Sequence, residues 1–332
     1  MQGHENIDYK EEFKFKTFSS RKFSRKSRLV NILLFSLISY FGAEIMTGST
    51  SVEGILKYPI SAMEGMIFYG FQVSIIADIS IRHKLNLGTI YLIGLIYGIL
   101  EEGFALFTME STASHTLWLS LIGLNITWTI YIMLFHAVIT VCSTIVIVHI
   151  ISKDTLREPF LNASAYAIMV PSLGIIYYTF IQSSLMADRV PDLTSLLILL
   201  LVAMIILGVT VLNERNPILN NFTKLRWILG NNISLIIWAI VLGTPFIFGN
   251  RIPLLLIPIT ILLGISLVYF YLFFQYKLNF DMKKSKQSFL FYATFNTVLL
   301  VFGTFNRTIP SDLLAISGIM FLIYFGFKKI YS

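Results

Sequence analysis

The chain has 332 residues, of which 56% are hydrophobic and only 13% are charged. This charged fraction is about half that of an average soluble domain, so the composition excludes a soluble globular protein. The single cysteine, Cys142, excludes a disulfide framework and a cysteine-rich metal site, and its apolar neighbours indicate a packing role. We therefore expect an all-helical integral protein of a prokaryotic plasma membrane, because a helix satisfies its own backbone hydrogen bonds in lipid.

The chain begins with a polar, basic segment, residues 1–28, which lacks the apolar core of a signal peptide. We interpret it as a cytoplasmic tail, which acts either as a disordered topology signal or as a contact for an anionic leaflet. The net charge of +7 does not indicate nucleic acid as a partner, since no basic stretch is long enough to fold apart from the membrane.

Ten apolar stretches follow, each close to the roughly 20 residues that a helix needs to cross the hydrocarbon. They are Leu29–Gly48, Ile60–Ile81, Gly88–Thr108, Thr127–Ile151, Ala163–Ser184, Leu193–Leu212, Ile233–Phe248, Ile252–Gln275, Phe289–Phe305 and Leu313–Phe327. We expect a polytopic bundle of about ten transmembrane helices, with a four-span polar-site half at 29–160 and a six-span apolar half at 161–332.

The distribution of basic residues predicts the orientation of these spans. If both termini are cytoplasmic, 21 of the 25 Lys and Arg residues lie on the inside and 4 on the outside, as the positive-inside rule requires. A second crossing between Glu110 and Lys153 would reverse every later loop. We therefore interpret Thr116–Leu124 as a short outer-surface or re-entrant element, ended by Gly123 and Asn125, that could cover a site.

Charged and histidine side chains within the apolar stretches occur only in the first four spans. Each is costly in hydrocarbon and needs a partner or a purpose. They are Glu44, Glu64, Asp78, Glu101, Glu102 and His136, together with His149, which lies near the inner interface and to which we assign no function.

Three of these residues have simpler explanations. Asp78 precedes Arg82 by four residues on one helical face, which predicts a structural ion pair. Glu44 lies at the outer end of its span, where it either reaches the interface or has a function. Glu64 is shallow and lies seven residues after Lys57, so we expect a salt bridge or a tentative metal ligand.

Glu101, Glu102 and His136 lie too deep to reach the interface. Adjacent carboxylates repel, so at least one should hold a proton or face a cation or metal. Gly94 and Gly98 predict close approach of a neighbouring helix on the glutamate face. His136 belongs to a polar stripe that should face the bundle interior rather than lipid. Its members are Asn125, Thr129, His136, Thr140 and Ser143.

The run Tyr97-Gly-Ile-Leu-Glu-Glu-Gly103, followed by His136, resembles the CAAX-processing and PrsW-type intramembrane proteases over the third and fourth spans. The resemblance implies that Glu101 or Glu102 is the general base and that His136 is a metal ligand or an oxyanion stabiliser. It also implies a divalent metal such as zinc, with Glu101, Glu102, His136 and tentatively Glu64 as ligands, and a membrane-embedded peptide substrate.

Two other classes of function remain open from the sequence. Intramembrane acids and histidines relay protons or bind cations in secondary transporters, and ten spans suit an inverted repeat. Alternatively, the chain is a noncatalytic subunit whose acids pair with basic residues of a partner subunit. In all three classes we expect the lipid bilayer as the surrounding partner.

Overall fold

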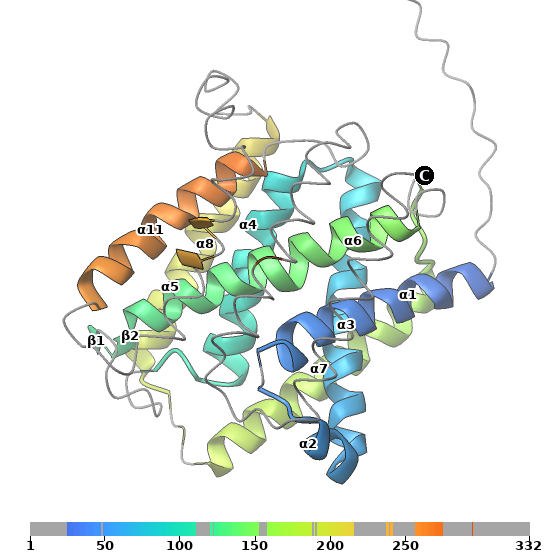
Figure 1. Ribbon diagram of the computed structural model, residues 1–332, viewed down its shortest axis with the longest axis horizontal. Coiled ribbons are helices and arrows are strands. Elements are labelled where there is room, and N and C mark those ends of the chain that lie inside the picture. Colours follow the sequence, from blue (N-terminus) through green and yellow to red (C-terminus); the bar gives the residue numbers. More distant parts are fainter. Residues whose placement is uncertain are drawn as a thin grey trace, which may run out of the picture.

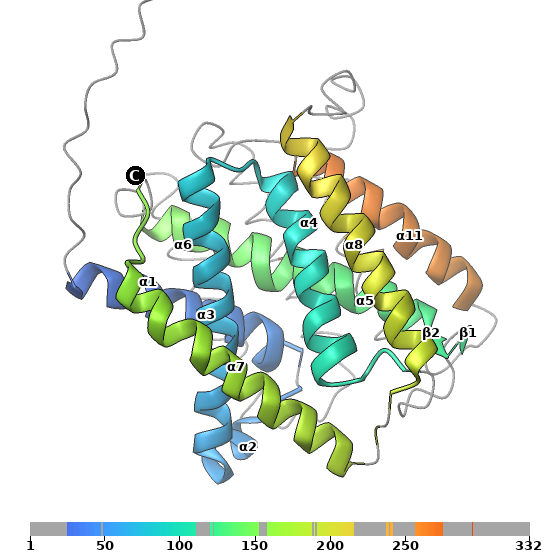
Figure 2. The same ribbon diagram turned by 180° about the vertical axis from the view of Figure 1, so that it is seen from behind.

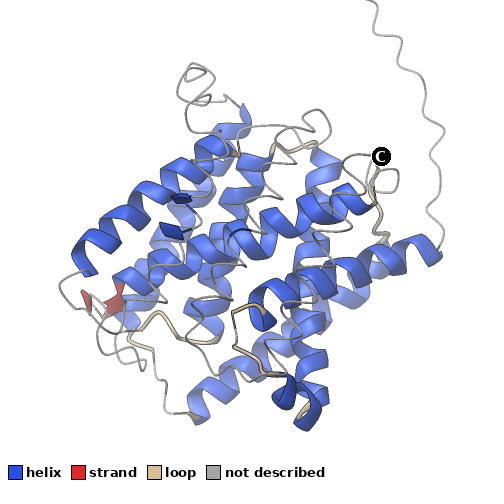
Figure 3. Cartoon of the chain, in the orientation of Figure 1, coloured by secondary structure: helices blue, strands red, loops and turns tan. Residues whose placement is uncertain are grey.

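The computed structural model describes residues 25–47, 49–110, 120–121, 123–152, 158–187, 189, 191–215, 237–238, 240–241, 256–274 and 294. These residues form a helical bundle with one small hairpin at its edge (Figures 1 and 3). Its elements are α1 (Arg25–Tyr40), η1 (Phe41–Ile45), α2 (Val52–Lys57), α3 (Pro59–His83), α4 (Leu87–Gly98), η2 (Ile99–Ala105), β1 (Ser120–Leu121), β2 (Leu124–Asn125), α5 (Ile126–Phe135), η3 (His136–Ser143), α6 (Thr144–Ile151), α7 (Ala163–Met186), α8 (Leu193–Arg215) and α11 (Leu256–Phe273), where η denotes a π-helical segment.

The structure has six helices that are long and apolar enough to cross a membrane within the described part of the chain. They are Lys26–Ile45, Pro59–His83, Leu87–Ala105, Ile126–Ile151, Ala163–Met186 and Leu193–Asn213. Each overlaps one of the first six predicted spans, and the helix α11 falls within the eighth. Residues 1–24 of the predicted basic tail lie outside the described residues, whereas 25–28 form the first turn of α1. The predicted span at 313–327, all but residue 294 of 289–305 and most of 233–248 also lie outside, so ten spans and cytoplasmic termini stay predictions.

Asparagine side chains cap the N-termini of three helical segments. Asn86, Asn125 and Asn162 accept hydrogen bonds from the backbone N–H groups of Thr89, Trp128 and Ala165. Each bond satisfies a donor that the first helical turn leaves without an intrahelical partner. The fourth span therefore starts at the residue after Asn125, one residue before the predicted start.

The fourth span, formed by α5, η3 and α6, is the centre of the bundle. Buried residues make up 94% of its most apolar stretch, against 11% in the helix α7, whose apolar side chains face outward. It packs against α1, α4 and α11, and Figure 1 shows it crossing in front of α4. Seen from behind, α3, α4 and α8 lie in a row and α7 crosses α3 (Figure 2). A side chain on the fourth span is thus surrounded by protein.

Two glycines allow α4 to approach the fourth span, as the sequence predicts. A Cβ atom added at Gly94 would lie 2.7 Å from the Cα atom of Ala137. One added at Gly98 would lie 3.1 Å from the Cα atom of Met133 and 3.3 Å from the Cβ atom of His136. Any larger residue would push the two helices apart, and with them the side chains of Glu101, Glu102 and His136.

The predicted ion pair between Asp78 and Arg82 is confirmed and belongs to a larger network. Asp78 accepts a hydrogen bond from Arg82 Nε at 2.6 Å and one from the Tyr166 hydroxyl at 2.9 Å. Its other oxygen accepts from the backbone N–H groups of Phe160 and Leu161 at 2.6 and 2.8 Å. The network ties the segment after the fourth span to α3, which is a structural role.

The predicted outer-surface element is described only in part. Its described residues form β1 and β2, an antiparallel hairpin that pairs Leu121 with Leu124. Gly123 has φ +75°, and a Cβ atom there would lie 2.4 Å from the Ser195 hydroxyl oxygen, so the turn requires glycine. Residues 111–119 lie outside the described part of the chain.

Candidate functional site

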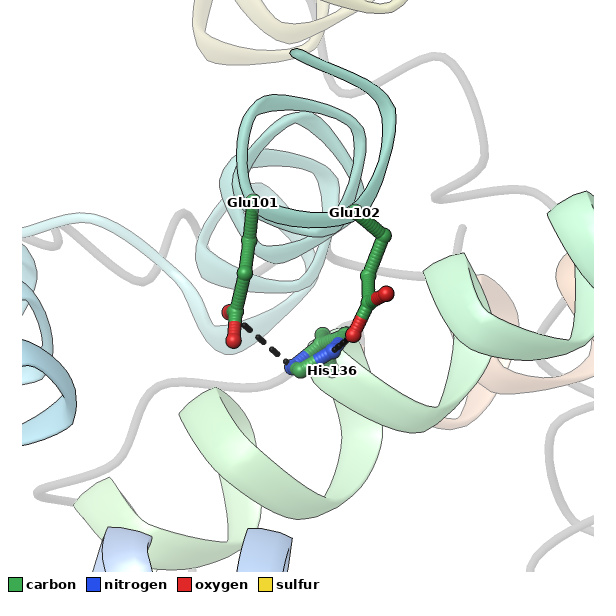
Figure 4. Close-up of side chains that lie close together, drawn as sticks. All are labelled: Glu101, Glu102 and His136. Atoms are coloured by element: carbon green, nitrogen blue, oxygen red, sulfur yellow. Dashed lines mark hydrogen bonds and ion pairs between the residues drawn. The ribbon is translucent and has the colours of Figure 1, made fainter. Parts of the chain in front are cut away.

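The structure brings together the three deep residues that the sequence singles out. Glu101 and Glu102 lie in η2, in the third span, and His136 is the first residue of η3, in the fourth. Both carboxylates point from one helix toward the imidazole on the other (Figure 4). Glu101 and His136 each expose 1% of their surface and Glu102 exposes 8%. The group is therefore a buried site between two packed helices.

The imidazole of His136 lies between the two carboxylates and contacts them through opposite ring nitrogens. Its Nε2 atom lies 3.3 Å from Glu102 Oε1, and its Nδ1 atom lies 3.5 Å from Glu101 Oε2 (Figure 4). The Thr140 hydroxyl, one turn further along η3, is 3.2 Å from Nδ1. Because a neutral imidazole has only one N–H, it can donate to only one carboxylate, and the group must share protons to satisfy both contacts.

Glu101, Glu102 and His136 lie in π-helical segments, whose turns are wider than those of an α-helix. In η2 the backbone N–H of Leu106 donates to the carbonyl of Glu101, a bond that spans five residues instead of four. Such π-helical turns are rare and often mark functional sites. An extra residue in a turn rotates the following side chains, so the sequence pattern of a regular helix does not predict their directions. The first, third and fourth spans each contain such a segment, namely η1, η2 and η3.

Two buried polar atoms beside His136, Glu101 Oε2 and the Tyr97 hydroxyl, have no hydrogen bond of good geometry to any residue that the structure describes. Tyr97 lies one turn before Glu101 and places its ring edge-on to the imidazole, with 5.3 Å between the ring centroids. Tyr97 and Tyr69 both interact with the Glu101 carboxylate. Unsatisfied buried polar atoms are rare, so this corner of the site is suited to a bound polar molecule.

Glu102 is held by a second set of contacts. The Thr108 hydroxyl donates to Glu102 Oε2, and the Thr108 backbone N–H donates to the Glu102 carbonyl at 2.8 Å. The indole N–H of Trp128 in turn donates to the Thr108 hydroxyl oxygen at 3.3 Å. Both oxygens of Glu102 are thus engaged, whereas Glu101 Oε2 has only its 3.5 Å contact with His136 Nδ1.

Some of the other polar residues predicted from the sequence lie at the site, and others lie away from it. The polar stripe on the fourth span is buried, as predicted, and Thr140 contacts His136. Glu64 is half-buried on α3 and is not part of the group of ligand atoms formed by Glu101, Glu102 and His136. Glu44 instead reaches toward the site, since it accepts a hydrogen bond from the Tyr69 hydroxyl at 2.8 Å.

Sequence reasoning missed the hydroxyl groups of Tyr69, Tyr97 and Thr108. Tyrosine and threonine are common in membrane helices, and no spacing in the sequence distinguishes these from others. A useful signal was available for Tyr97 alone, because it lies four residues before Glu101 and therefore shares its helical face.

The donor atoms are of the types that bind a divalent metal. One atom from each of Glu101, Glu102 and His136 lies within 4.8 Å of the other two. Zinc, however, sits about 2.0–2.3 Å from its ligands and takes one nitrogen of a histidine. Because the carboxylates contact different ring nitrogens, the arrangement as it stands does not fit a single ion, and a carboxylate would have to move to join it. We derive no chemical step through a metal.

Comparison with known proteins identifies the family. A model of an uncharacterized membrane protein family matches residues 33–326, which is most of the chain. No curated protein and no solved structure matches. The chain belongs to this membrane protein family.

Proposed function

We propose that Glu101, Glu102 and His136 form the catalytic centre of an intramembrane hydrolase. The observation that carries the proposal is the pair of buried carboxylates on either side of one imidazole, with the Tyr97 hydroxyl beside Glu101, whose Oε2 atom has only the 3.5 Å contact with His136 Nδ1. Hydrolysis needs a base for water and a donor for the carbonyl oxygen, and these two atoms can supply both.

Each residue has a role in this proposal. Glu101 takes a proton from water, and the hydroxide oxygen attacks the carbonyl carbon of the substrate. The Tyr97 hydroxyl donates a hydrogen bond to the carbonyl oxygen as it gains charge. Glu101 then gives its proton to the leaving nitrogen when the carbon–nitrogen bond breaks. His136, held by Glu102, positions Glu101 and balances the charge of the carboxylates.

The contacts around the site favour access from a single face of the membrane. Thr108 and Trp128 lie at the end of the third span and the start of the fourth, so they connect Glu102 to the same face. In the other direction the contacts of His136 reach Thr140, and the buried Ser143 hydroxyl beyond it has no hydrogen-bond partner among the residues that the structure describes. A hydrolase needs one route for water and substrate, whereas a transporter needs access to both faces.

The resemblance of the Tyr97–Gly103 run and His136 to glutamate-type intramembrane proteases agrees with this assignment and indicates a membrane-embedded peptide as substrate. A noncatalytic subunit is less suited to the geometry, because Glu101 and Glu102 contact His136 of their own chain. They need no basic residue from a partner subunit.

Proton-coupled transport is the second candidate function. One observation favours it, namely that the imidazole bridges two carboxylates through opposite nitrogens, which is the geometry of a proton relay. Reconstitution into vesicles that contain a pH-sensitive dye tests this alternative. Proton flux that depends on His136 and on a cation gradient would support transport over hydrolysis.

Hydrolysis is tested with synthetic transmembrane peptides reconstituted together with the purified protein in ¹⁸O-labelled water. Mass spectrometry should find new carboxyl ends that contain ¹⁸O, and Glu101→Gln and His136→Ala should abolish them. Glu110→Gln is the matched control, because Glu110 is a buried acid outside the group. Labelled ends that persist in Glu101→Gln would contradict the proposed role of Glu101.

A further inference from the structure

We propose that Glu44 and Tyr69 form a proton relay between Glu101 and the face of the membrane at which the first and third spans end. The inference deepens the proposed function and rests on it, because Glu101 must first lose any proton of its own to solvent before it can take one from water. It adds a carboxylate from the first span, which is remote in sequence from the catalytic group.

Glu44 is hydrogen-bonded both to α3 and to the loop that follows η1. Its Oε1 atom accepts a hydrogen bond from the Tyr69 hydroxyl at 2.8 Å. Its Oε2 atom accepts one from the Thr50 hydroxyl at 2.7 Å. Glu44 therefore connects a residue of α3 with the loop that follows η1.

Tyr69 connects Glu44 with the catalytic group. Its ring lies nearly parallel to that of His136, with 6.4 Å between centroids and an angle of 14° between the planes. Its hydroxyl interacts with the Glu101 carboxylate as well as donating to Glu44. One hydroxyl thus stands between two carboxylates, which is the arrangement that a proton transfer needs.

The exposure of these residues rises step by step along the proposed path. Glu101 and Tyr69 are buried, Glu44 and Thr50 are half-buried, and Ser49 is exposed. The segment η1, which holds Glu44, packs against η3, which holds His136. Like η2 and η3, η1 is a π-helical turn, in which the N–H of Met46 donates to the carbonyl of Phe41.

The relay moves one proton without leaving a charge on tyrosine. The proton on Glu101 passes to the phenolic oxygen of Tyr69 while the Tyr69 proton passes to Glu44 Oε1. Glu44 then releases its proton to water near Ser49 and Thr50. A rotation of the Tyr69 hydroxyl restores the starting state, so no oxidant or other reactant is required.

Infrared spectroscopy of the protein in membranes tests the relay without any substrate. A protonated Glu101 has a carbonyl stretching band that is absent in Glu101→Gln and that shifts when the proton exchanges for deuterium after transfer to D₂O. We expect Tyr69→Phe and Glu44→Gln to slow this exchange by about 10²-fold, the lower end for a positioned proton-transfer group.

Tyr166→Phe is the matched control, because the Tyr166 hydroxyl donates to Asp78, a buried carboxylate remote from the site. It should leave the exchange rate unchanged. Exchange at the wild-type rate in both Tyr69→Phe and Glu44→Gln would overturn the relay, as would the lack of any Glu101-dependent band over the pH range in which the protein stays folded. Because no peptide is cleaved in this experiment, a failure of the hydrolase assay leaves its outcome unaffected.

Discussion

At the scale of single residues, Glu101 and Glu102 are adjacent in sequence but differ in their surroundings. Glu102 has both oxygens engaged, by His136 and by Thr108, whereas Glu101 Oε2 makes no hydrogen bond. An oxygen that is already saturated cannot accept a proton from water without losing a contact. Within the proposed hydrolase, this difference favours Glu101 as the base and Glu102 as the residue that positions His136.

Tyr97→Phe tests the role of the tyrosine hydroxyl. If this hydroxyl stabilises the charged carbonyl oxygen, its loss should lower kcat by about 10²–10³ while KM changes little, as for removal of an oxyanion donor. The measurement is the rate of peptide cleavage, with Tyr166→Phe as control. A rise in KM at constant kcat would show that Tyr97 only binds substrate.

Asp78→Asn tests the structural network around Asp78, which lies near the C-terminal end of α3. Asparagine keeps the shape but loses the charge that pairs with Arg82, and one of its terminal groups donates where Asp78 accepts. Removing one member of a buried charged network costs about 3 kcal/mol. We expect a lower melting temperature in detergent with the infrared band of Glu101 retained. Loss of that band would show that Asp78 also shapes the site.

At the scale of elements, the contact between α4 and the fourth span determines the distance between the glutamates and His136. Gly94 and Gly98 face the backbone of the fourth span, and Glu101 follows Gly98 within one turn. The spacing of small residues and acids allowed this contact to be predicted. The π-helical turns could not be predicted, since no residue pattern in the chain distinguishes a turn of five-residue bonds from one of four.

Gly94→Ala tests this contact. The added methyl group would lie 2.7 Å from the Ala137 Cα atom, so a helix must shift, and overpacking of this kind costs about 1–3 kcal/mol. We expect lower thermal stability and weaker cleavage. Gly174→Ala is the matched control, because a Cβ atom there meets nothing within 4 Å and alanine favours the helix. Equal effects of both substitutions would contradict the close contact.

At the scale of the whole molecule, the apolar stretches predicted the first six spans to within a few residues of their observed ends. Burial of the fourth span at the centre of the bundle was not predictable, because hydropathy reports lipid compatibility and not which helices meet. The contact between Glu44 and Tyr69, which lie 25 positions apart in the sequence, was not predictable for the same reason. The sequence therefore indicated the buried group of Glu101, Glu102 and His136 but not the residues of the proposed relay.

The orientation of the spans is tested by labelling introduced cysteines with a membrane-impermeant thiol reagent. We expect Lys57→Cys to react from outside the cell and His83→Cys only after the membrane is opened, because these exposed residues lie at opposite ends of the second span. Cys142 is buried and should not react. Labelling of both sites from one side would contradict the predicted crossing.

The placement of His136 between Glu101 and Glu102 is tested most directly by ¹⁵N solid-state NMR of histidine-labelled protein in membranes, with the His136 signals assigned from their loss in His136→Ala. We expect Glu101→Gln to shift mainly the Nδ1 signal and Glu102→Gln mainly the Nε2 signal, because each carboxylate contacts a different ring nitrogen. Shifts of the same nitrogen in both variants, or of neither, would contradict the bridged group on which the proposed function depends.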